Sequence, residues 1–341
     1  MFTKLLLKWH ARDNHREMPW KGERNPYKIW ISEIILQQTR VEQGLKYYEA
    51  LLTNFPTIQD LAAASDESVF RLWQGLGYYS RCRNMLFTAR YICEHYAGEF
   101  PQDYPTIRQL KGVGDYTAAA IASFAFDLPY AVIDGNVVRV LSRFFAIDQS
   151  FFTTSGRANF FQLAQQLLDK KHSAAYNQAI MDLGAVICKP QTPDCGICPL
   201  QNHCKANTQK VQHLYPVKKI KNPVREREFH FYVIEDSHGI YIRKRQSNDI
   251  WKDLYTFPHM EPGENEFGLK PPYVVEVEGQ EPQILYQTLS HQRIKGIFYR
   301  VRKIKSPLLK DSDLIKVTVN DLNQYAFPKL IISFFKNNNY L

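Results

Sequence analysis

The sequence predicts an all-α N-terminal domain followed by a smaller α+β domain. Apolar residues recur at helical spacing through the first 205 residues, in the ranges 28–53, 66–97, 116–126, 158–169 and 174–187. From residue 229 onward, short apolar runs bounded by turn residues replace this pattern, which is typical of strands. A chain of 341 residues is long enough to form two such domains.

We place the helical domain at 1–205 and the α+β domain at 229–341. Residues 206–228 are polar and basic, contain two prolines and lack a helical face, which favours a linker. Two apolar runs at 229–234 and 240–243 flank a turn and predict a hairpin. We expect further strands at 272–278, 294–302 and 314–318, a helix after Asn320, and another at 327–337.

Composition restricts the class of protein. The net charge of +9 fits a polyanionic partner, although charge alone identifies no ligand. No apolar run approaches the roughly 18 residues of a membrane span. The first residues, MFTKLLLKWHARDNHREMPW, fit neither a signal peptide nor a transit peptide. We therefore expect a soluble cytoplasmic protein that has no membrane contact.

Four of the six cysteines form the pattern Cys188-x6-Cys195-x2-Cys198-x5-Cys204. Structural zinc sites usually pair their thiolates at gaps of two to four residues, and here only one gap is that short. Four clustered thiolates can instead hold an iron–sulfur cluster. Disulfides are not expected because nothing marks the chain as secreted. The spacing favours an iron–sulfur cluster, with zinc as the alternative.

Two carboxylates are candidates for acid–base chemistry. Glu33 lies among large apolar residues, so it is either an exposed helix residue or a desolvated acid with a raised pKa. Asp134 precedes Gly135 and a helical pattern, where it would serve as an N-cap and could also face a cleft. One protonated acid beside one anion is a known arrangement for breaking glycosidic bonds.

A glycine turn, Gly112-Val113-Gly114, precedes the helical pattern at 116–126. Glycines let the backbone approach an anion, and the following helix N-terminus offers amide donors. An ordinary turn between helices would have the same sequence. Between two predicted helices, the segment resembles a helix-hairpin-helix element that binds a DNA phosphate.

Taken together, the motifs resemble those of MutY-type adenine DNA glycosylases, within the helix-hairpin-helix superfamily. The matching segments, in chain order, are 18–20, 30–39, 75–81, 112–118, 134–137 and 177–185, followed by the four cysteines. The resemblance spans nearly the whole chain. It implies a 4Fe–4S cluster on Cys188, Cys195, Cys198 and Cys204, which would brace the loop 189–194 against DNA without electron transfer.

The resemblance also implies roles for matched positions. Glu33 would protonate adenine at N7, and Asp134 would stabilise the oxocarbenium-like sugar. Tyr116 and Asn136 would help to position the acid, the anion and the sugar. The DNA-binding positions would be Gln38 and Tyr78, which wedge beside the partner base, the nearby Leu76, and the hairpin residues Gly112, Val113 and Gly114. Without the resemblance, core packing would explain Tyr78 equally well.

Position 116 separates close relatives within the resemblance. Bifunctional thymine-glycol glycosylases carry a lysine there that forms a Schiff base and drives strand cleavage. Tyr116 therefore implies a monofunctional enzyme.

The C-terminal domain resembles the Nudix-like domain that these enzymes use to read 8-oxoguanine. The chain lacks the Nudix motif R-E-x-x-E-E, so this domain should bind without hydrolysing nucleotides. The recognition loop aligns with Leu289, Ser290 and His291, with Leu289 in place of the usual Phe.

The hairpin also departs from the family pattern Leu-Pro-Gly-Val-Gly-Arg. Lys111 replaces Pro and Asp115 replaces Arg, and we expect a phosphate contact from Lys111 and a helix cap from Asp115.

The expected function is hydrolysis of the N-glycosidic bond of adenine paired with 8-oxoguanine or guanine in duplex DNA, by a monomeric enzyme. A related glycosylase for oxidised pyrimidines is one alternative, and Tyr116 argues against it. An inactive, redox-regulated mismatch-binding protein is another, and the presence of both Glu33 and Asp134 argues against it.

Overall fold

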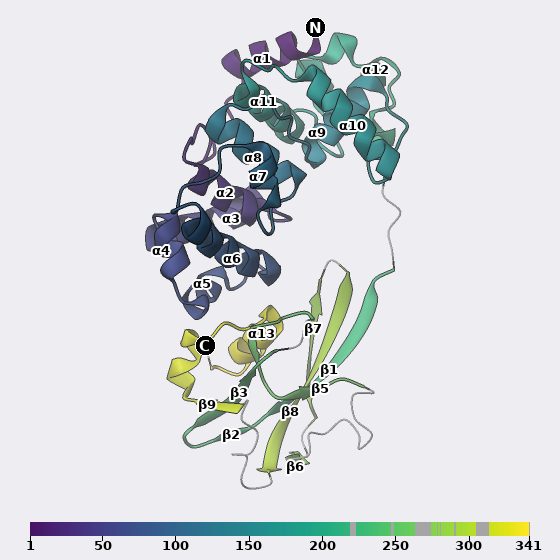
Figure 1. Cartoon of the computed structure of the whole chain (residues 1–341). Helices are drawn as coiled ribbons and strands as arrows, with labels where there is room; N and C mark the ends of the chain where they lie inside the picture. The colour runs from purple at the N-terminus through teal and green to yellow at the C-terminus, as the bar shows by residue number, and fades with distance from the viewer. Residues whose placement is uncertain are drawn as a thin grey trace. The chain divides into compact units, whose positions relative to one another are not determined.

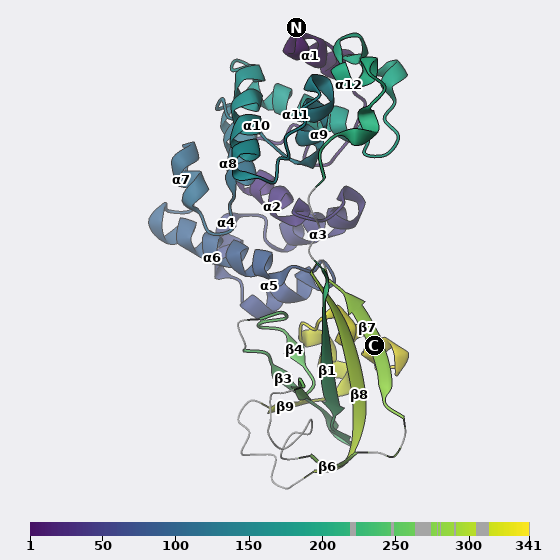
Figure 2. The same cartoon turned by 90° about the vertical axis from the view of Figure 1, so that its right-hand side faces the viewer.

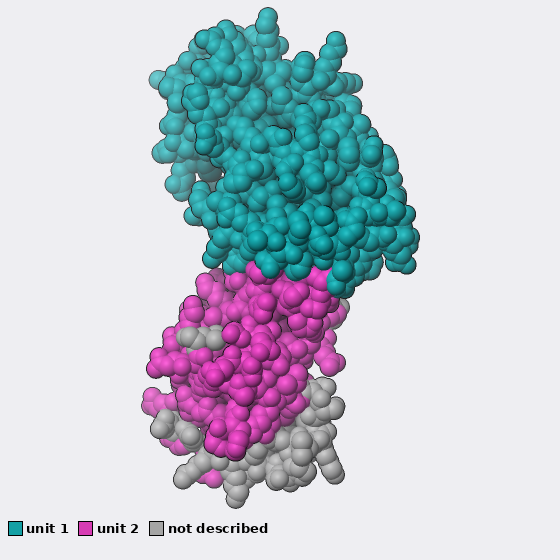
Figure 3. Space-filling model, turned by 90° about the vertical axis from the view of Figure 1, so that its left-hand side faces the viewer, with its two compact units in different colours: residues 1–63, 83–220 teal, residues 64–82, 221–341 magenta. Residues whose placement is uncertain are grey.

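The computed structural model describes residues 1–218, 223–246, 249–262, 274–277, 279, 281–289, 291–304 and 314–340 (Figure 1). The chain divides into two compact units, which we describe separately (Figure 3). Unit 1 comprises residues 1–63 and 83–220, and unit 2 comprises residues 64–82 and 221–341. Residues 64–82, which we had assigned to the helical domain, thus group with the C-terminal strands.

Unit 1 is helical, in agreement with the predicted fold class. Its helices are α1 (Phe2–Arg12), α2 (Pro26–Leu36), α3 (Val41–Asn54), α4 (Ile58–Ala63), most of α6 (Tyr79–His95), α7 (Tyr104–Gln109), α8 (Asp115–Phe126), α9 (Gly135–Phe145), α10 (Thr154–Leu167), α11 (Ser173–Val186) and the short α12 (Lys205–Thr208). Among the described residues, no helix is long and apolar enough to span a membrane.

Two of the predicted helical segments are each divided into two helices. The range 28–53 becomes α2 and α3, separated by a turn in which Gln38 has a φ of 59°. The range 66–97 becomes α5 (Asp66–Trp73) and α6, separated by a turn in which Tyr78 has a φ of 49°. Left-handed backbone at a residue other than glycine interrupts a helix without any change in apolar spacing.

The core of unit 1 lies between α1, α8, α9, α10 and α11. It includes Phe2 and Trp9 of α1, Phe160 of α10 and Tyr176 of α11, and three of the clustered cysteines pack against its edge. Asp134 caps α9 as predicted, accepting a 2.7 Å hydrogen bond from the Val137 amide. The loop before α9 is therefore fixed at the base of this core.

Unit 2 contains α5, two sheets and a C-terminal helix. Its strands are β1 (Arg225–Val233), β2 (Glu235–Asp236), β3 (Gly239–Lys244), β4 (Tyr255–Thr256), β5 (His259–Met260), β6 (Val274–Val277), β7 (Gln283–Thr288), β8 (Gln292–Ile304) and β9 (Leu314–Val317), followed by a 3-10 helix at Val319–Gln324 and α13 (Lys329–Asn337). One sheet has the order β5-β1-β8-β6, with β7 also on β8, and the other has β2-β3-β4, with β9 on β3 (Figure 2).

The predicted hairpin between 229–234 and 240–243 forms only next to its turn, where β2 pairs antiparallel with β3 and the Tyr241 amide donates to the Ile234 carbonyl. β1 pairs in parallel with β8, whereas β3 pairs with β2, β4 and β9 in the second sheet. The chain changes sheets between Val233 and Glu235, so the turn connects β3 to the two-residue β2 only. The predicted linker is also partly wrong, because α12, a 3-10 turn at Gln212–Leu214 and the start of β1 fall within 206–228.

Aromatic side chains form the core of unit 2. Phe298 of β8 stacks on Phe334 of α13, with ring centroids 4.4 Å apart, and Phe257 packs edge-on against Phe334. Gly296 lets α13 approach β8, because a Cβ at this position would lie 2.8 Å from Leu330. The hairpin β7–β8, which carries the predicted recognition loop, is thereby packed against α13.

Candidate active site

A cavity of about 690 Å³ in unit 1 brings together the four predicted catalytic residues. Its wall includes Glu33 from α2, Tyr116 from α8, and Asp134 and Asn136 from the start of α9. The predicted DNA-binding residue Gln38 also lines it. The cavity is thus built where three helices meet, and its polar groups come from distant parts of the sequence.

Glu33 is a buried carboxyl group. The helix α2 starts with Asn25 as N-cap and Pro26 in its first turn, and nearly all of its remaining residues are buried. Glu33 is only 6% exposed. Burial raises its pKa to about 7; a hydrogen bond with Tyr116 opposes this rise, and the charge of Asp134 adds to it. The desolvated-acid interpretation is therefore the correct one, and Glu33 can hold a proton near neutral pH.

Asp134 has a different environment, although burial raises its pKa as well. Its carboxylate accepts hydrogen bonds from the Val137 amide at 2.7 Å and from the Asn136 side chain at 2.6 Å, and both lower the pKa. These donors favour the ionised form. Tyr116 is close to both carboxylates, whose charges add to burial in raising its pKa. The Tyr116 hydroxyl thus stays protonated and hydrogen-bonds Glu33.

Asn136 connects Asp134 to the cysteine loop through Arg139. The Arg139 guanidinium donates to Asn136 Oδ1 at 2.8 Å, to the carbonyl of Gly184 at 2.7 Å and to the carbonyl of Cys188 at 2.7 Å. Gly184 is required here, since a Cβ would lie 2.5 Å from the Asn136 Cβ. Sequence reasoning missed Arg139, although its place one turn after Asn136 on the predicted helix was a usable signal.

A second network that the sequence did not reveal surrounds Asp182. This fully buried carboxylate accepts hydrogen bonds from Arg16 at 2.8 Å, Asn14 at 2.8 Å and Gln178 at 2.9 Å, and Lys21 lies 3.3 Å away. The side chains of Arg16, Lys21 and Gln178 line the cavity. Asp182 therefore fixes polar groups on the cavity wall. No local sequence motif predicts this network.

The four cysteines line one small cavity of about 30 Å³. Burial, together with the charges of the other three cysteines, raises the pKa of the Cys198 thiol to about 12. Four sulfurs in this setting need a positively charged centre to become thiolates. All four cysteines line the same space, which fits a polynuclear cluster held by four thiolates.

Arg143 holds the loop that carries these cysteines. Its buried guanidinium donates to the carbonyls of Lys189 at 2.7 Å and Pro190 at 2.8 Å, and lies 3.4 Å from Cys188 Sγ. It also donates to the carbonyls of Gln212 and Tyr215, in the segment that we had predicted to be a linker. The cysteine loop and the chain after it are thus fixed to α9.

The glycine hairpin has the backbone that its sequence requires. Gly112 has a φ of 82°, and a Cβ there would lie 2.7 Å from Asn84. Gly114 is the N-cap of α8 and the helix has no side-chain cap. The expected cap by Asp115 is therefore wrong, because Asp115 pairs with Arg108 at 2.5 Å instead.

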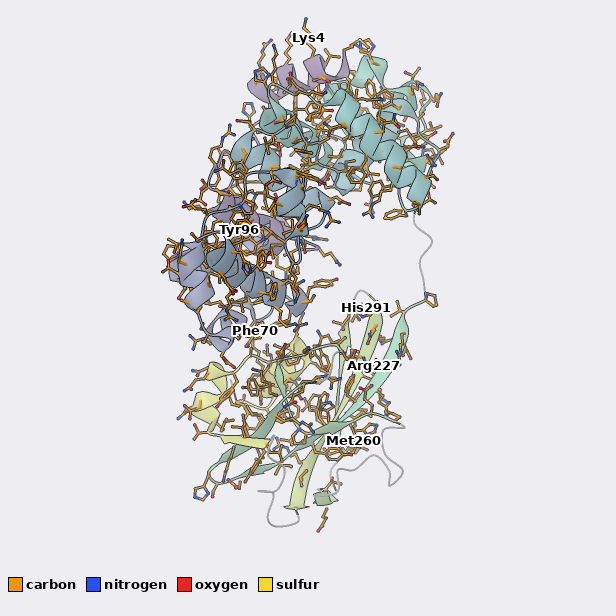
Figure 4. The ribbon with its side chains drawn as sticks, in the orientation of Figure 1. Lys4, Phe70, Tyr96, Arg227, Met260 and His291 are labelled. Atoms are coloured by element: carbon orange, nitrogen blue, oxygen red, sulfur yellow. The ribbon has the colours of Figure 1, made fainter. Side chains whose placement is uncertain are left out.

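The remaining predicted DNA-binding residues lie in unit 2. Leu76 is buried, whereas Tyr78 is 39% exposed and lies under the Arg81 guanidinium. In the predicted recognition loop, the Leu289 amide donates to the Gln292 carbonyl, and His291 is exposed between β7 and β8 (labelled in Figure 4). Ser290 lies outside the described residues.

These features define a class of protein. A helical unit with a glycine hairpin, a cavity lined by two buried carboxyl groups, and a cysteine loop correspond to a base-excision DNA glycosylase. Residues 31–158 match the HhH-GPD superfamily of base excision DNA repair proteins, residues 188–204 the iron–sulfur binding domain of endonuclease III, and residues 230–337 the NUDIX domain. The chain accordingly carries an iron–sulfur cluster.

Relatives identify the particular family. The adenine DNA glycosylase of Buchnera aphidicola (from Acyrthosiphon pisum) is 34% identical over 76% of this chain and 74% of its own length. That of Rattus norvegicus is 44% identical over 60% of this chain and 42% of its own. The structure of a thermostable thymine-DNA glycosylase matches with a TM-score of 0.57 and 28% identity, over 61% of this chain and 95% of its own. The chain belongs to the MutY-type adenine DNA glycosylase family.

Proposed function

We propose that this enzyme hydrolyses the N-glycosidic bond of adenine that is paired with 8-oxoguanine or guanine in duplex DNA. The observation that carries the proposal is the carboxyl pair in the cavity, where burial raises the pKa of Glu33 to about 7, whereas hydrogen bonds from Val137 and Asn136 oppose the rise in the pKa of Asp134. Adenine inside a duplex cannot reach these groups, so the nucleoside must first flip into the cavity.

In the proposed reaction, Glu33 donates its proton to adenine N7. The electron pair of the glycosidic bond then leaves with the base, and positive charge develops on the sugar. Asp134 stabilises that charge, and water then adds to the sugar carbon and loses a proton to the Glu33 carboxylate, which completes the hydrolysis and restores the acid. Tyr116 hydrogen-bonds Glu33, and Asn136 holds the carboxylate of Asp134. Because residue 116 is not lysine, the enzyme forms no Schiff base and leaves the strand intact.

The other predicted residues are assigned to DNA recognition. The hairpin Gly112-Val113-Gly114 binds a backbone phosphate, and Gln38, Leu76 and Tyr78 support the opened base stack. Leu289, Ser290 and His291 read the oxidised base. The 4Fe–4S cluster would be held by Cys188, Cys195, Cys198 and Cys204. Its bonds to Cys188 and Cys195 would fix the two ends of the loop 189–194. We propose that the enzyme acts as a cytoplasmic monomer.

The test measures free adenine released from a duplex with one adenine opposite 8-oxoguanine. Parallel duplexes carry A·G, A·T or thymine glycol, and hot alkali reveals abasic sites. We expect release from the first two duplexes only, with strand breaks after alkali alone. Release from the thymine-glycol duplex would instead support the oxidised-pyrimidine alternative. Tight binding without release, in protein that retains its cluster, would support the inactive mismatch-binding alternative.

A further inference from the structure

Lys111, at the start of the glycine hairpin, lies on an exposed aromatic ring. Its Nζ is 4.2 Å from the centroid of Phe87, which is 49% exposed on α6. Phe87 is the first of a row of rings one helical turn apart: it stacks on Tyr91, and Tyr91 stacks on His95 with centroids 4.1 Å apart. The row fixes the ring, and the ring attracts the ammonium group.

The same helix also fixes the backbone of the hairpin. The buried hydroxyl of Thr88 donates to the Lys111 carbonyl at 2.9 Å. Asn84 lies directly against Gly112, with no space for a Cβ between them. Asn84, Phe87 and Thr88 lie on neighbouring turns of α6, so one rigid element sets both the path of the turn and the direction of the Lys111 side chain.

The charges around the hairpin leave Lys111 as its available cation. Arg108 pairs with Asp115 at 2.5 Å and also donates to the Val113 carbonyl, so these two charges offset each other. Within the ranges that the structure describes, Lys111 forms no ion pair. The first-turn amides of α8 lack a side-chain cap as well. A cation beside amide donors, held without an acidic partner, suits an anion supplied by another molecule.

We infer that Lys111 binds a DNA backbone phosphate beside the hairpin, and that Phe87 is the residue that positions it. The inference rests on the proposed DNA-glycosylase function and deepens it, because it assigns a side-chain cation to a turn whose proposed phosphate ligands are otherwise backbone amides. Relative to the family pattern, Lys111 adds one positive charge whereas Asp115 in place of Arg lowers the charge by two, so Lys111 offsets half of that change.

The experiment measures the salt dependence of binding to an undamaged duplex, by fluorescence anisotropy with the full-length cluster-containing protein. Each phosphate neutralised by a cation contributes about 0.9 to the slope of log K against log salt. Lys111→Met should therefore reduce the slope by about 0.9. Between about 50 and 200 mM salt the wild type should lose roughly 3.5-fold more affinity than this variant. Lys111→Arg should keep the wild-type slope.

Two further variants separate positioning from bulk charge. Phe87→Leu should weaken binding when Lys111 is present and have no added effect in a Lys111→Met background, since the ring acts through the ammonium. Lys4→Met, which removes an exposed charge on α1 (Figure 4), should leave the slope unchanged. An unchanged slope in Lys111→Met, or an equal decrease in Lys4→Met, would overturn the inference.

The proposed function is tested separately with the same protein preparation. Adenine release by the wild type from the 8-oxoguanine duplex tests the glycosylase proposal, and the salt slope tests the phosphate contact. Release with an unchanged slope in Lys111→Met refutes the contact alone. If the wild type releases no adenine while Lys111→Met still has a reduced slope, the glycosylase proposal is refuted and the phosphate contact is supported.

Discussion

Replacing Glu33 by Gln should stabilise the enzyme above neutral pH while strongly lowering its activity. The carboxyl group has a pKa of about 7 in the fold, against an ordinary value of 4.5. That difference corresponds to about 3 kcal/mol. The folded-state pKa is the higher one. The contribution of the protonated group to the free energy of unfolding is therefore complete below about pH 4.5 and is lost as the pH rises through about 7. Glutamine cannot ionise and avoids this loss.

The free energy of unfolding of the full-length protein should be compared by urea denaturation at about pH 5 and pH 8. We expect Glu33→Gln to exceed the wild type by about 3 kcal/mol at the higher pH and by less than about 1 kcal/mol at the lower. Glu49→Gln, at an exposed position on α3, is the matched control and should show no such dependence. A stability difference that does not change with pH would refute the buried-acid reasoning.

The same substitution should lower adenine release by a factor of about 10² to 10⁴, the usual contribution of a general acid. In the wild type, single-turnover release should fall about tenfold for each pH unit well above 7, as the proton on Glu33 is lost. Full release by Glu33→Gln would show that another group protonates the base.

Further predictions concern the supports of the site and the recognition loop. Gly184→Ala should cost about 1–3 kcal/mol of stability and slow adenine release, because its Cβ would lie 2.5 Å from Asn136; thermal unfolding and single-turnover kinetics test this, and an unchanged rate would exclude a positioning role for Asn136. Arg143→Met should speed loss of iron to a chelator, since several loop carbonyls would lose their donor at about 1–3 kcal/mol each; iron retained as in the wild type would contradict it. Leu289→Phe restores the residue that the family carries and should increase the ratio of the adenine release rate opposite 8-oxoguanine to that opposite guanine. Parallel kinetics on the two duplexes measure this ratio, and an unchanged ratio would contradict the prediction.

Apolar spacing located α2, α3, α5, α6, α8, α10 and α11, but not the breaks between α2 and α3 or between α5 and α6. The interruption after α2 includes left-handed backbone at Gln38, which no glycine announces, whereas the break after α5 contains Gly75 and Gly77, both with positive φ, as well as Tyr78. Such conformations cost free energy and persist where the surrounding fold enforces them, often at functional sites. The two positions that periodicity missed are positions to which the resemblance assigns contacts with the base stack.

The sheet could not be predicted from local pattern for a different reason. Alternation identifies a strand but not its partner, and β1 pairs with β8, which lies more than sixty residues further along the chain. The hairpin prediction assumed that neighbours in sequence pair in space. The chain instead passes from one sheet to the other between Val233 and Glu235, and no local residue signals this change.

The candidate site shows how much long-range geometry adds to the residues themselves. The sequence identified Glu33, Asp134 and the four cysteines as separate features. It did not connect Asp134 to the cysteines. The structure joins them through Asn136 and Arg139, with successive hydrogen bonds of 2.6, 2.8 and 2.7 Å from Asp134 to the Cys188 carbonyl. If the cysteine loop unfolded, Arg139 would lose its Cys188 acceptor, and only the Gly135 and Gly184 carbonyls would then hold the guanidinium against Asn136. The cluster can therefore affect the proposed reaction through geometry alone, without electron transfer.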